Sequence, residues 1–181
     1  SLGLVGSEMC IRDRSMIVTL HPRTRTDMYS GNARWDEIAA LVDSLDVPVI
    51  GNGDITVGFD ARRMRDQTNC AGVMIARGSH GYPWIFAQAR AALDGLPIPE
   101  GPDVEERFQV CLEHIRNGLQ FGRDADRTLI DFRKHLGWYT KGLPNGRTLR
   151  SEVFQVTTLE QVELLLQGYL ESYLERSGQP E

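Results

Sequence analysis

The sequence predicts an α/β domain built on a parallel sheet, followed by an all-helical domain. Between residues 16 and 95, short apolar runs alternate with helical patterns, as in successive βα units. Residues 96–102 contain three prolines, which is typical of a stiff linker. Residues 103–176 show helical periodicity throughout. With 181 residues, 41% of them hydrophobic, the chain can bury a substantial core.

Three βα units follow one another in the first domain. Strands are expected at residues 17–21, 47–50 and 72–76. The intervening helical patterns comprise a stripe from Ile38 to Leu45 and helices over residues 59–68 and 83–93. Pro83 would lie in a first turn, where its missing N–H does no harm. Because the strands are almost wholly apolar, we expect a parallel sheet covered on both faces.

Apolar stripes at helical spacing predict a small bundle in the second domain. Three stripes are expected to face its core: Phe108, Leu112, Ile115 and Leu119; Leu129, Phe132, Leu136 and Tyr139; and Leu159, Val162, Leu166, Tyr169 and Tyr173. A shorter helix is expected over residues 148–154. Thr157 and Glu160 have the spacing of a capping box before the last helix.

Residues 1–15 do not follow either pattern, and we interpret them as a non-native leader, with a short surface helix as the alternative. They lack the apolar region and cleavage site of a secretory signal. The cysteines, Cys10, Cys70 and Cys111, have no metal-ligand spacing, so a reducing cytoplasm and no bound metal are expected. No apolar run approaches the roughly 18 residues of a membrane span.

Two glycine-containing turns each follow a predicted strand and precede a predicted helix. The first lies in the run Val49–Ile55 and the second in the run Val73–Gly78. Glycines let main-chain N–H groups converge on an anion, and the following helix adds the positive end of its dipole. A pair of such turns after consecutive strands predicts a site for the phosphate of a cofactor, although each turn alone is also an ordinary turn composition.

The net charge of −5 conceals a basic segment in the helical domain. Residues 123–150 carry seven basic side chains against three aspartates, so this segment is +4 and the rest of the chain is −9. The average therefore argues against a surface that coats nucleic acid uniformly, whereas the segment suits phosphates locally.

Six motifs occur in the order HPRTR (21–25), YSG (29–31), PVIGNGDI (48–55), GVMIARG (72–78), PWIF (83–86) and RKHLGWYTKG (133–142). Together they resemble the C-terminal half of the tRNA-dihydrouridine synthase family, from about Met16 to Tyr173. The resemblance implies a partial (β/α)8 TIM barrel, residues 16–95, whose three strands are the sixth to the eighth. It also implies a helical tRNA-binding domain, residues 103–176, after the linker.

For an intact enzyme, the resemblance implies FMN as the cofactor, NADPH as its reductant and tRNA as the partner, with a monomeric protein. Reduced flavin would deliver hydride to C6 of a uridine while a cysteine protonates C5, giving 5,6-dihydrouridine. That cysteine and a flavin-contacting lysine lie in the first five barrel units, which this sequence lacks, and Cys10 is no substitute for the cysteine. We therefore assign no catalytic residue, and expect the chain alone to be inactive and its strand edges to be unpaired.

The resemblance also implies the cofactor site. The residues expected to contact FMN are His21, Asn52, Gly53, Asp54, Ala76, Arg77 and Gly78. Asp54 could cap or orient the loop instead of touching the ligand, and His21 could be an ordinary hydrogen-bonded residue at a strand end. Ala76 stands where a glycine is common, and alanine would be strained if its φ were positive.

The expected RNA contacts are Arg133, Lys134, Trp138, Tyr139 and Lys141, because cations neutralise phosphates and aromatic rings stack on bases. The alternative is a solvated helix face whose aromatic residues belong to the core. Two other functions stay open. One is a different FMN-dependent barrel, such as a dihydroorotate or dihydropyrimidine dehydrogenase relative, and the other is a non-catalytic RNA-binding module.

Overall fold

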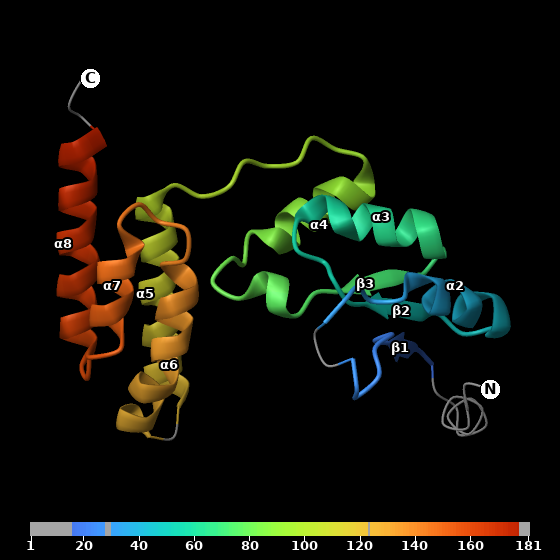
Figure 1. The fold of residues 1–181 in the computed structure, drawn as a ribbon, viewed down its shortest axis with the longest axis horizontal. Coiled ribbons are helices and arrows are strands. Elements are labelled where there is room, and N and C mark those ends of the chain that lie inside the picture. Colours follow the sequence, from blue (N-terminus) through green and yellow to red (C-terminus); the bar gives the residue numbers. More distant parts are fainter. Residues whose placement is uncertain (1–15, 28–29, 123, 178–181) are drawn as a thin grey trace. The chain divides into compact units, whose positions relative to one another are not determined.

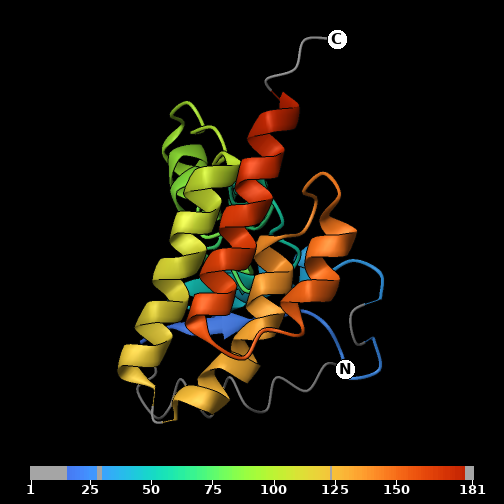
Figure 2. The same ribbon diagram turned by 90° about the vertical axis from the view of Figure 1, so that its left-hand side faces the viewer.

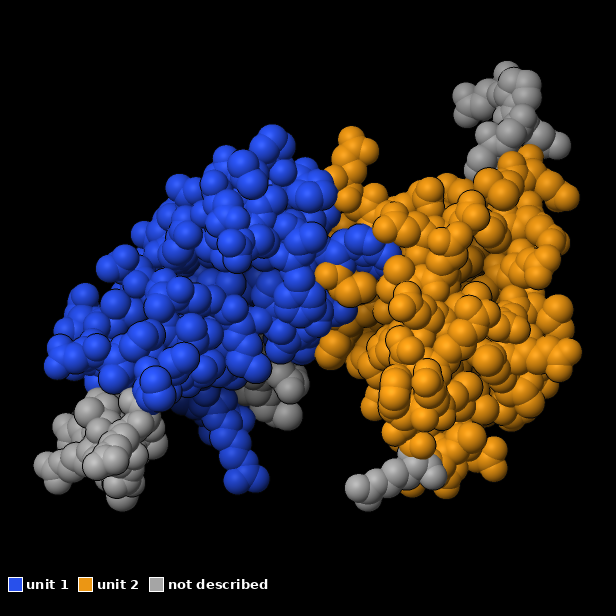
Figure 3. Space-filling model, turned by 180° about the vertical axis from the view of Figure 1, so that it is seen from behind, with its two compact units in different colours: residues 1–79, 84–99 blue, residues 80–83, 100–181 orange. Residues whose placement is uncertain are grey.

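The computed structural model of the chain describes residues 16–27, 30–122 and 124–177. The predicted leader, Cys10, Tyr29 and Arg123 lie outside the described residues. The chain divides into two compact units, shown in blue and orange in Figure 3. Unit 1 comprises residues 1–79 and 84–99, and unit 2 comprises residues 80–83 and 100–181. The short segment His80–Pro83 therefore belongs to the helical unit, although it lies within the α/β part of the sequence.

Unit 1 contains a sheet of three parallel strands in the order β1-β2-β3, which confirms the predicted α/β pattern (Figure 1). The strands are β1 (Val18–Leu20), β2 (Val49–Asn52) and β3 (Gly72–Met74). The helices are α2 (Trp35–Ser44), α3 (Gly58–Thr68) and α4 (Ile85–Asp94), with a 3-10 turn, η1 (Arg77–Ser79), after β3.

Helices α2 and α3 pack against one face of this sheet, and α4 packs on α3. Val49 is buried on that face, and a Cβ atom on Gly51 would lie 2.6 Å from the sulfur of Met64, so α3 packs directly onto the β2 backbone. Alternate residues point to the other face, where Thr19 is exposed and Met74 retains 47% of its accessible surface. The expectation of cover on both faces is therefore wrong for the described residues, since the apolar strands have a second face that they leave open.

Local side-chain bonds set where the helices begin. At the start of α3, one carboxylate oxygen of Asp60 accepts hydrogen bonds from Thr56 N, Thr56 Oγ1 and Val57 N at 2.9–3.0 Å. Burial raises the pKa of Asp60, but these bonds and the charge of Arg63 outweigh it and hold the pKa below its ordinary value. Three donors thus fix one carboxylate at this turn.

Helix α4 begins at Ile85, not at Pro83 as expected. Pro83 belongs to the segment that packs with unit 2, so the chain has not yet entered the helix at that residue. The helix ends at Gly95, whose φ of +70° is the left-handed conformation that commonly stops a helix.

The described residues of unit 2 form four helices, which Figures 1 and 2 show. They are α5 (Val104–Phe121), α6 (Ala125–Tyr139), α7 (Gly146–Val153) and α8 (Leu159–Ser177). Helix α5 packs against both α6 and α8, and α7 bridges α6 to α8. Asp103 and Asp124 cap α5 and α6 by accepting bonds from Glu106 N at 2.8 Å and Arg127 N at 2.9 Å.

The α6 stripe and part of the other two stripes form the core of unit 2, whereas five stripe residues are only partly buried: Leu112, Leu119, Leu159, Tyr169 and Tyr173. All four residues of the α6 stripe, Leu129, Phe132, Leu136 and Tyr139, are buried, as are Phe108, Ile115, Val162 and Leu166. Helix α7 begins at Gly146, two residues before its expected start.

The predicted capping box lies one residue too early in the sequence. The hydroxyl of Thr158, not that of Thr157, accepts the bond from the backbone N–H three residues later, Gln161 N, at 3.2 Å. The side-chain oxygen of Gln161 in turn accepts from Thr157 N at 2.7 Å. Thr157 and Thr158 are both good capping residues, so spacing alone could not choose between them.

Candidate functional site

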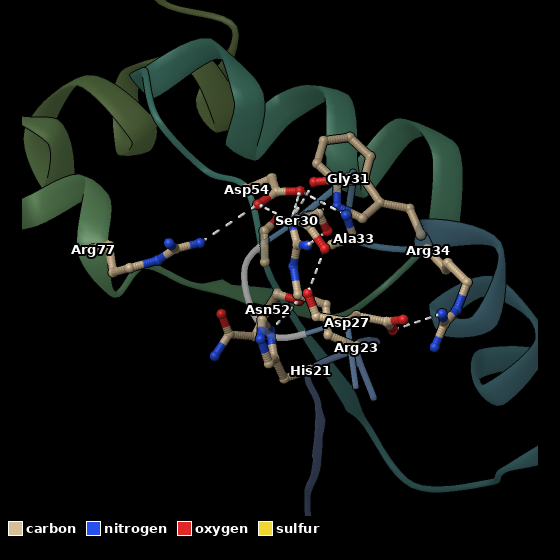
Figure 4. Close-up of polar contacts among 12 residues, drawn as sticks. His21, Arg23, Asp27, Ser30, Gly31, Ala33, Arg34, Asn52, Asp54 and Arg77 are labelled. Atoms are coloured by element: carbon tan, nitrogen blue, oxygen red, sulfur yellow. Dashed lines mark hydrogen bonds and ion pairs between the residues drawn. The ribbon is translucent and has the colours of Figure 1, made fainter. Parts of the chain in front are cut away.

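Asp54 is the residue at which the loops of unit 1 meet (Figure 4). It follows β2, and its carboxylate accepts bonds from Arg23 Nη2 at 2.8 and 2.7 Å and from Ala33 N at 2.6 Å. Arg77 Nη2, from the loop after β3, lies 3.9 Å away. One carboxylate therefore joins the loops that follow all three strands.

The pairing of Asp54 with Arg23 is largely buried. The Arg23 side chain keeps 4% of its accessible surface and Asp54 keeps 28%. Burial raises the pKa of Asp54, but the bonds from Arg23 and Ala33 and the charges of Arg23 and Arg77 outweigh it, so the pKa lies below its ordinary value. Asp54 is therefore ionised at neutral pH. Its contacts support the alternative that it orients the loop instead of touching a ligand.

Gly53, directly before Asp54, has a φ of +125°, which strongly favours glycine. A Cβ atom there would lie 2.8 Å from the Ala33 side chain and 3.3 Å from His21 Nδ1. Asp54 itself has a φ of +57°, a left-handed conformation that aspartate tolerates better than most residues. Both positive φ values turn the chain sharply at the end of β2.

His21 and Asn52 lie at the ends of neighbouring strands. Nδ1 of His21 is 3.4 Å from the carbonyl oxygen of Asn52, and the Asn52 amide donates to the sulfur of Met74 at 3.2 Å. Asn52 pairs with Met74 in the sheet register, so both lie on the face away from the helices. That open face is where a planar ligand could reach them.

The second glycine turn packs directly against the first. A Cβ atom on Gly78 would overlap the carbonyl oxygen of Ile55, so only glycine allows this contact. Ala76 is absent from the described residues with positive φ, and the alanine there is therefore unstrained. Its carbonyl accepts bonds from Ser79 N at 3.0 Å and Ser79 Oγ at 2.8 Å. The two predicted phosphate turns thus form one continuous structure.

Arg23 and Trp35 are the site residues that sequence reasoning missed. Arg23 holds Asp54 and also donates to the carbonyls of Ser30 at 2.6 Å and Gly31 at 3.0 Å. The indole N–H of Trp35 donates to the carbonyl of Gly53 at 3.1 Å. The available signal was charge: Arg23 and Asp54 are opposite charges that follow the ends of two adjacent parallel strands.

The predicted RNA-contact residues divide into surface and interior positions in unit 2. Lys134 and Lys141 are exposed and Trp138 is half-buried. Lys134 and Trp138, four residues apart, lie on one side of α6, whereas Lys141 lies two residues beyond the last residue of the helix, Tyr139. Nε of Arg133 donates to the carbonyl of Val156 at 2.9 Å, so this side chain also anchors the segment before α8.

Tyr139 lies in the core, which agrees with the alternative that the aromatic residues of this helix belong to the core. Only 3% of it is exposed, and its hydroxyl lies 3.3 Å from His114 Nδ1. Burial, with the charge of Cys111, raises the pKa of Tyr139 to about 12. In this arrangement its ring is not accessible to RNA.

Trp138 is partly covered by histidines. Its ring stacks on His80 with centroids 4.0 Å apart and an interplanar angle of 16°, and His135 packs edge-on at 4.8 Å. Burial lowers the pKa of His135 to about 4, and the charges of His114, Lys134 and His80 act in the same direction. His135 is therefore uncharged at neutral pH.

The described cysteines do not have the character of proton donors. Cys70 is 2% exposed and Cys111 is fully buried. Burial raises the pKa of the Cys111 thiol to about 12. Within residues 16–27, 30–122 and 124–177, no group of three or more histidine, cysteine, aspartate or glutamate side chains could hold a metal ion. None of the helices in these ranges is long and apolar enough to cross a membrane.

Comparison with known proteins identifies the class of protein that these features belong to. The profile of the family described as dihydrouridine synthase (Dus) matches residues 15–175. The chain therefore belongs to the dihydrouridine synthase family.

Individual proteins with names of this family also match the chain. The chain is 40% identical over 151 residues to a probable tRNA-dihydrouridine synthase of Mycobacterium tuberculosis (strain ATCC 25618 / H37Rv), covering 82% of this chain and 38% of that protein. It is 42% identical over 142 residues to a probable tRNA-dihydrouridine synthase of Rhodobacter capsulatus, covering 78% and 43%. It is 34% identical over 152 residues to tRNA-dihydrouridine synthase B of Pasteurella multocida, covering 84% and 46%. The chain thus spans less than half the length of these relatives.

Proposed function

We propose that this chain is the flavin-phosphate and tRNA-binding part of an FMN-dependent tRNA-dihydrouridine synthase. The observation that carries the proposal is the contact between the two glycine turns at the ends of adjacent parallel strands, where Gly78 meets Ile55. In a (β/α)8 barrel, the loops after strands seven and eight form a phosphate site on the catalytic face. The match of the family profile over residues 15–175 supports the same assignment.

The residues present fit an FMN phosphate and ribityl chain. Gly53 and Gly78 keep the turns free of Cβ atoms, and Asp54 fixes the first turn through Arg23. Asn52, Gly53, Ala76 and Arg77 would hold the phosphate end, and His21 would face the flavin from the open face of the sheet. When bound and reduced by NADPH, FMN would supply the hydride for C6 of uridine. In this proposal Asp54 orients the loop and does not touch the ligand.

The basic side of α6 would hold the RNA. Lys134 lies on α6 and Lys141 lies two residues beyond its last residue, Tyr139, and both side chains are exposed. Two exposed cations can contact separate phosphates of one RNA backbone. Trp138 would contribute its uncovered surface, Arg133 would add charge beside it, and Tyr139 would support the helix from the core.

Titration of the 181-residue chain with FMN and with tRNA tests the two parts separately. FMN fluorescence should be quenched on binding, and Gly53→Ala should abolish that quenching because the new Cβ atom meets Ala33 and His21. Filter binding of tRNA at 50 and 200 mM salt should show a strong salt dependence, with a log–log slope reduced by about two in the double variant Lys134→Gln/Lys141→Gln. Arg116→Gln, which breaks an exposed pair between α5 and α8, is the matched control and should leave the slope unchanged.

The outcomes separate the alternatives. Flavin binding without salt-sensitive tRNA binding would favour another FMN-dependent barrel. Salt-sensitive tRNA binding without flavin would favour a non-catalytic RNA-binding module. If the chain takes up neither ligand, the proposal fails.

A further inference from the structure

Unit 1 contains an open hollow of about 520 Å³ that the proposed flavin contacts do not explain. It lies between the loop that follows β1 and one side of α3. The side chains that matter for its chemistry are Asn32, Trp35, Asp60, Arg63, Gln67 and Arg77. Asn52, Gly53, Ala76 and Gly78 do not line it, so it shares only Asp54 and Arg77 with the predicted cofactor residues.

One face of α3 forms a wall of the hollow. Asp60, Arg63 and Gln67 are spaced by three and four residues and therefore share that face. The neighbouring arginines point to the other side: Arg65 donates to the carbonyl of Leu93 at 2.7 Å, at the end of α4. The Arg63 side chain is 52% exposed and is held by one bond of 2.9 Å to Asp60.

Trp35 supplies a planar wall whose position is fixed. Its indole N–H is bonded to the carbonyl of Gly53, which ties the ring to the end of β2. The guanidinium carbon of Arg63 lies 5.6 Å from the centroid of the ring, within the range of a cation–π contact. The hollow thus combines a flat aromatic surface with a cation beside it.

The lining charges leave one positive charge in excess. Arg23, Arg63 and Arg77 line the hollow against Asp54 and Asp60. Arg63 is half-exposed and is not among the proposed cofactor contacts, so its guanidinium is one that a ligand in the hollow can reach. A phosphodiester carries one negative charge, whereas a terminal phosphate carries about −1.5 to −2 near neutral pH. The single reachable guanidinium of Arg63 therefore suits a phosphodiester, and exposed Asn32 and Gln67 offer amide hydrogen bonds to an adjoining ribose or base.

We propose that this hollow binds one backbone phosphodiester of the RNA, with the adjoining ribose or base against Trp35. The proposal rests on RNA being the substrate, as proposed above, and adds a contact in unit 1 to those of α6. Arg63 pairs with the phosphate, Trp35 provides the planar surface, and Asp60 holds Arg63 in place.

Binding of the dinucleotide uridylyl-(3′→5′)-uridine to the 181-residue chain tests this directly. The indole N–H signal of Trp35 in a ¹H–¹⁵N spectrum, assigned with Trp35→Phe, should shift saturably. Arg63→Gln should weaken binding about tenfold, because it removes a charge-assisted contact, and Arg63→Lys should lose less. Arg90→Gln, which removes an exposed arginine of α4 paired only locally with Asp94, should bind as the parent does.

Two control ligands show whether binding depends on the phosphate and on its being a diester. Uridine, which has no phosphate, should not produce the saturable shift. If uridine 5′-monophosphate bound more tightly than the dinucleotide, the hollow would be a terminal-phosphate site and the proposal would be overturned. An unshifted Trp35 signal, or equal effects of Arg63→Gln and Arg90→Gln, would also overturn it. Because the α6 contacts are measured by tRNA binding with the lysine variants, salt-sensitive tRNA binding without a dinucleotide response would reject this inference alone.

Discussion

Asp54 organises unit 1 because three loops depend on one carboxylate. It neutralises the buried guanidinium of Arg23 and accepts a bond from Ala33 N, which places the loop after β1 against the loop after β2. Its left-handed φ of +57° is the backbone conformation that this position requires. The conformation and the charge are separate contributions, and substitution can distinguish them.

Asp54→Asn should destabilise unit 1 through the loss of charge. Asparagine tolerates the left-handed conformation, so the main effect is that the Arg23 side chain, which is 4% exposed, loses its charged partner and keeps its bonds to the carbonyls of Ser30 and Gly31. We expect the free energy of unfolding to fall by about 3 kcal/mol. Urea unfolding in a Trp138→Phe background would measure this, since the two remaining tryptophans, Trp35 and Trp84, lie in unit 1.

The matched control is Asp66→Asn, which breaks the exposed pair with Arg62 on α3. This pair should contribute less than about 1 kcal/mol. Equal losses from both substitutions would show that the Arg23–Asp54 pair has no special role.

Gly78→Ala should destabilise the contact between the two turns. The added methyl group overlaps the carbonyl oxygen of Ile55, so the loops must separate, at a cost of about 1–3 kcal/mol. Gly168→Ala is the opposite case, because its Cβ would meet nothing within 4 Å in the middle of α8. That change should stabilise the helix by about 0.5–1 kcal/mol. Thermal unfolding of the two variants should therefore shift in opposite directions.

At this scale, the sequence predicted the turn glycines but not the ion pair that fixes them. The glycines and Asn52 follow apolar runs, which is a local pattern. The contact between Arg23 and Asp54 spans 31 residues and depends on the path of the loop after β1, which no local pattern determines. Tyr139 was ambiguous for a related reason, since its place in an apolar stripe and its place in a basic motif predicted different surroundings.

Helix α6 has a core side and a basic side. Leu129, Phe132 and Leu136 are buried, while Lys134 is exposed. Helical periodicity was sufficient to predict this division. It could not predict the stacking of Trp138 on His80, because His80 precedes α4 in the sequence and joins α6 only through tertiary packing.

The histidines around α6 should make the stability of unit 2 depend on pH. Since the pKa of His135 is lowered from 6.5 to about 4, the folded chain binds fewer protons than the unfolded chain within that window. The free energy of unfolding should therefore fall as the pH is lowered from 6.5 towards 4. His114, whose pKa burial also lowers, acts in the same direction.

Urea unfolding of the helical signal at several pH values between 7.5 and 4 would measure this dependence. His135→Phe should flatten it, because phenylalanine keeps the aromatic packing against Phe132 without a titrating group. His21→Gln, in unit 1, should leave the dependence of unit 2 unchanged. A profile that is as steep with His135→Phe as in the parent chain would contradict the assignment.

At the scale of the whole molecule, the sequence predicted an α/β half followed by a helical half. It did not predict which of the two units each segment joins. The alternating patterns and the helical stripes agree with the observed order of elements, although α4 and α7 begin at other residues than expected. Residues 80–83 group with unit 2, however, since Gly81, at a φ of +67°, packs against the backbone of Trp138 and Tyr139. Packing of a loop on a distant helix leaves no periodic signal in the sequence.

Limited proteolysis should cut first in the linker. Residues 94–101 are exposed, including Leu96 at 60% and Ile98 at 43%. A protease with broad specificity should therefore produce a fragment that begins near residues 96–102, and the four helices of unit 2 should stay protected. Mass spectrometry of a time course would identify the cut. Earlier cleavage within α5 or α6 would contradict this division.

The path of the chain through residues 80–83 limits how the protein can be dissected. A chain that began at the linker would contain the helices of unit 2 without residues 80–83. Because His80 stacks on Trp138, the indole of Trp138 would then be more exposed to water. To fold as it does in the full chain, an isolated helical unit would need residues 80–83 to be restored, for example as a synthetic peptide added in trans. By the same reasoning, a chain that is cut in the linker should elute as one species from a size-exclusion column under native conditions. The packing of residues 80–83 on α6 would hold its two pieces together.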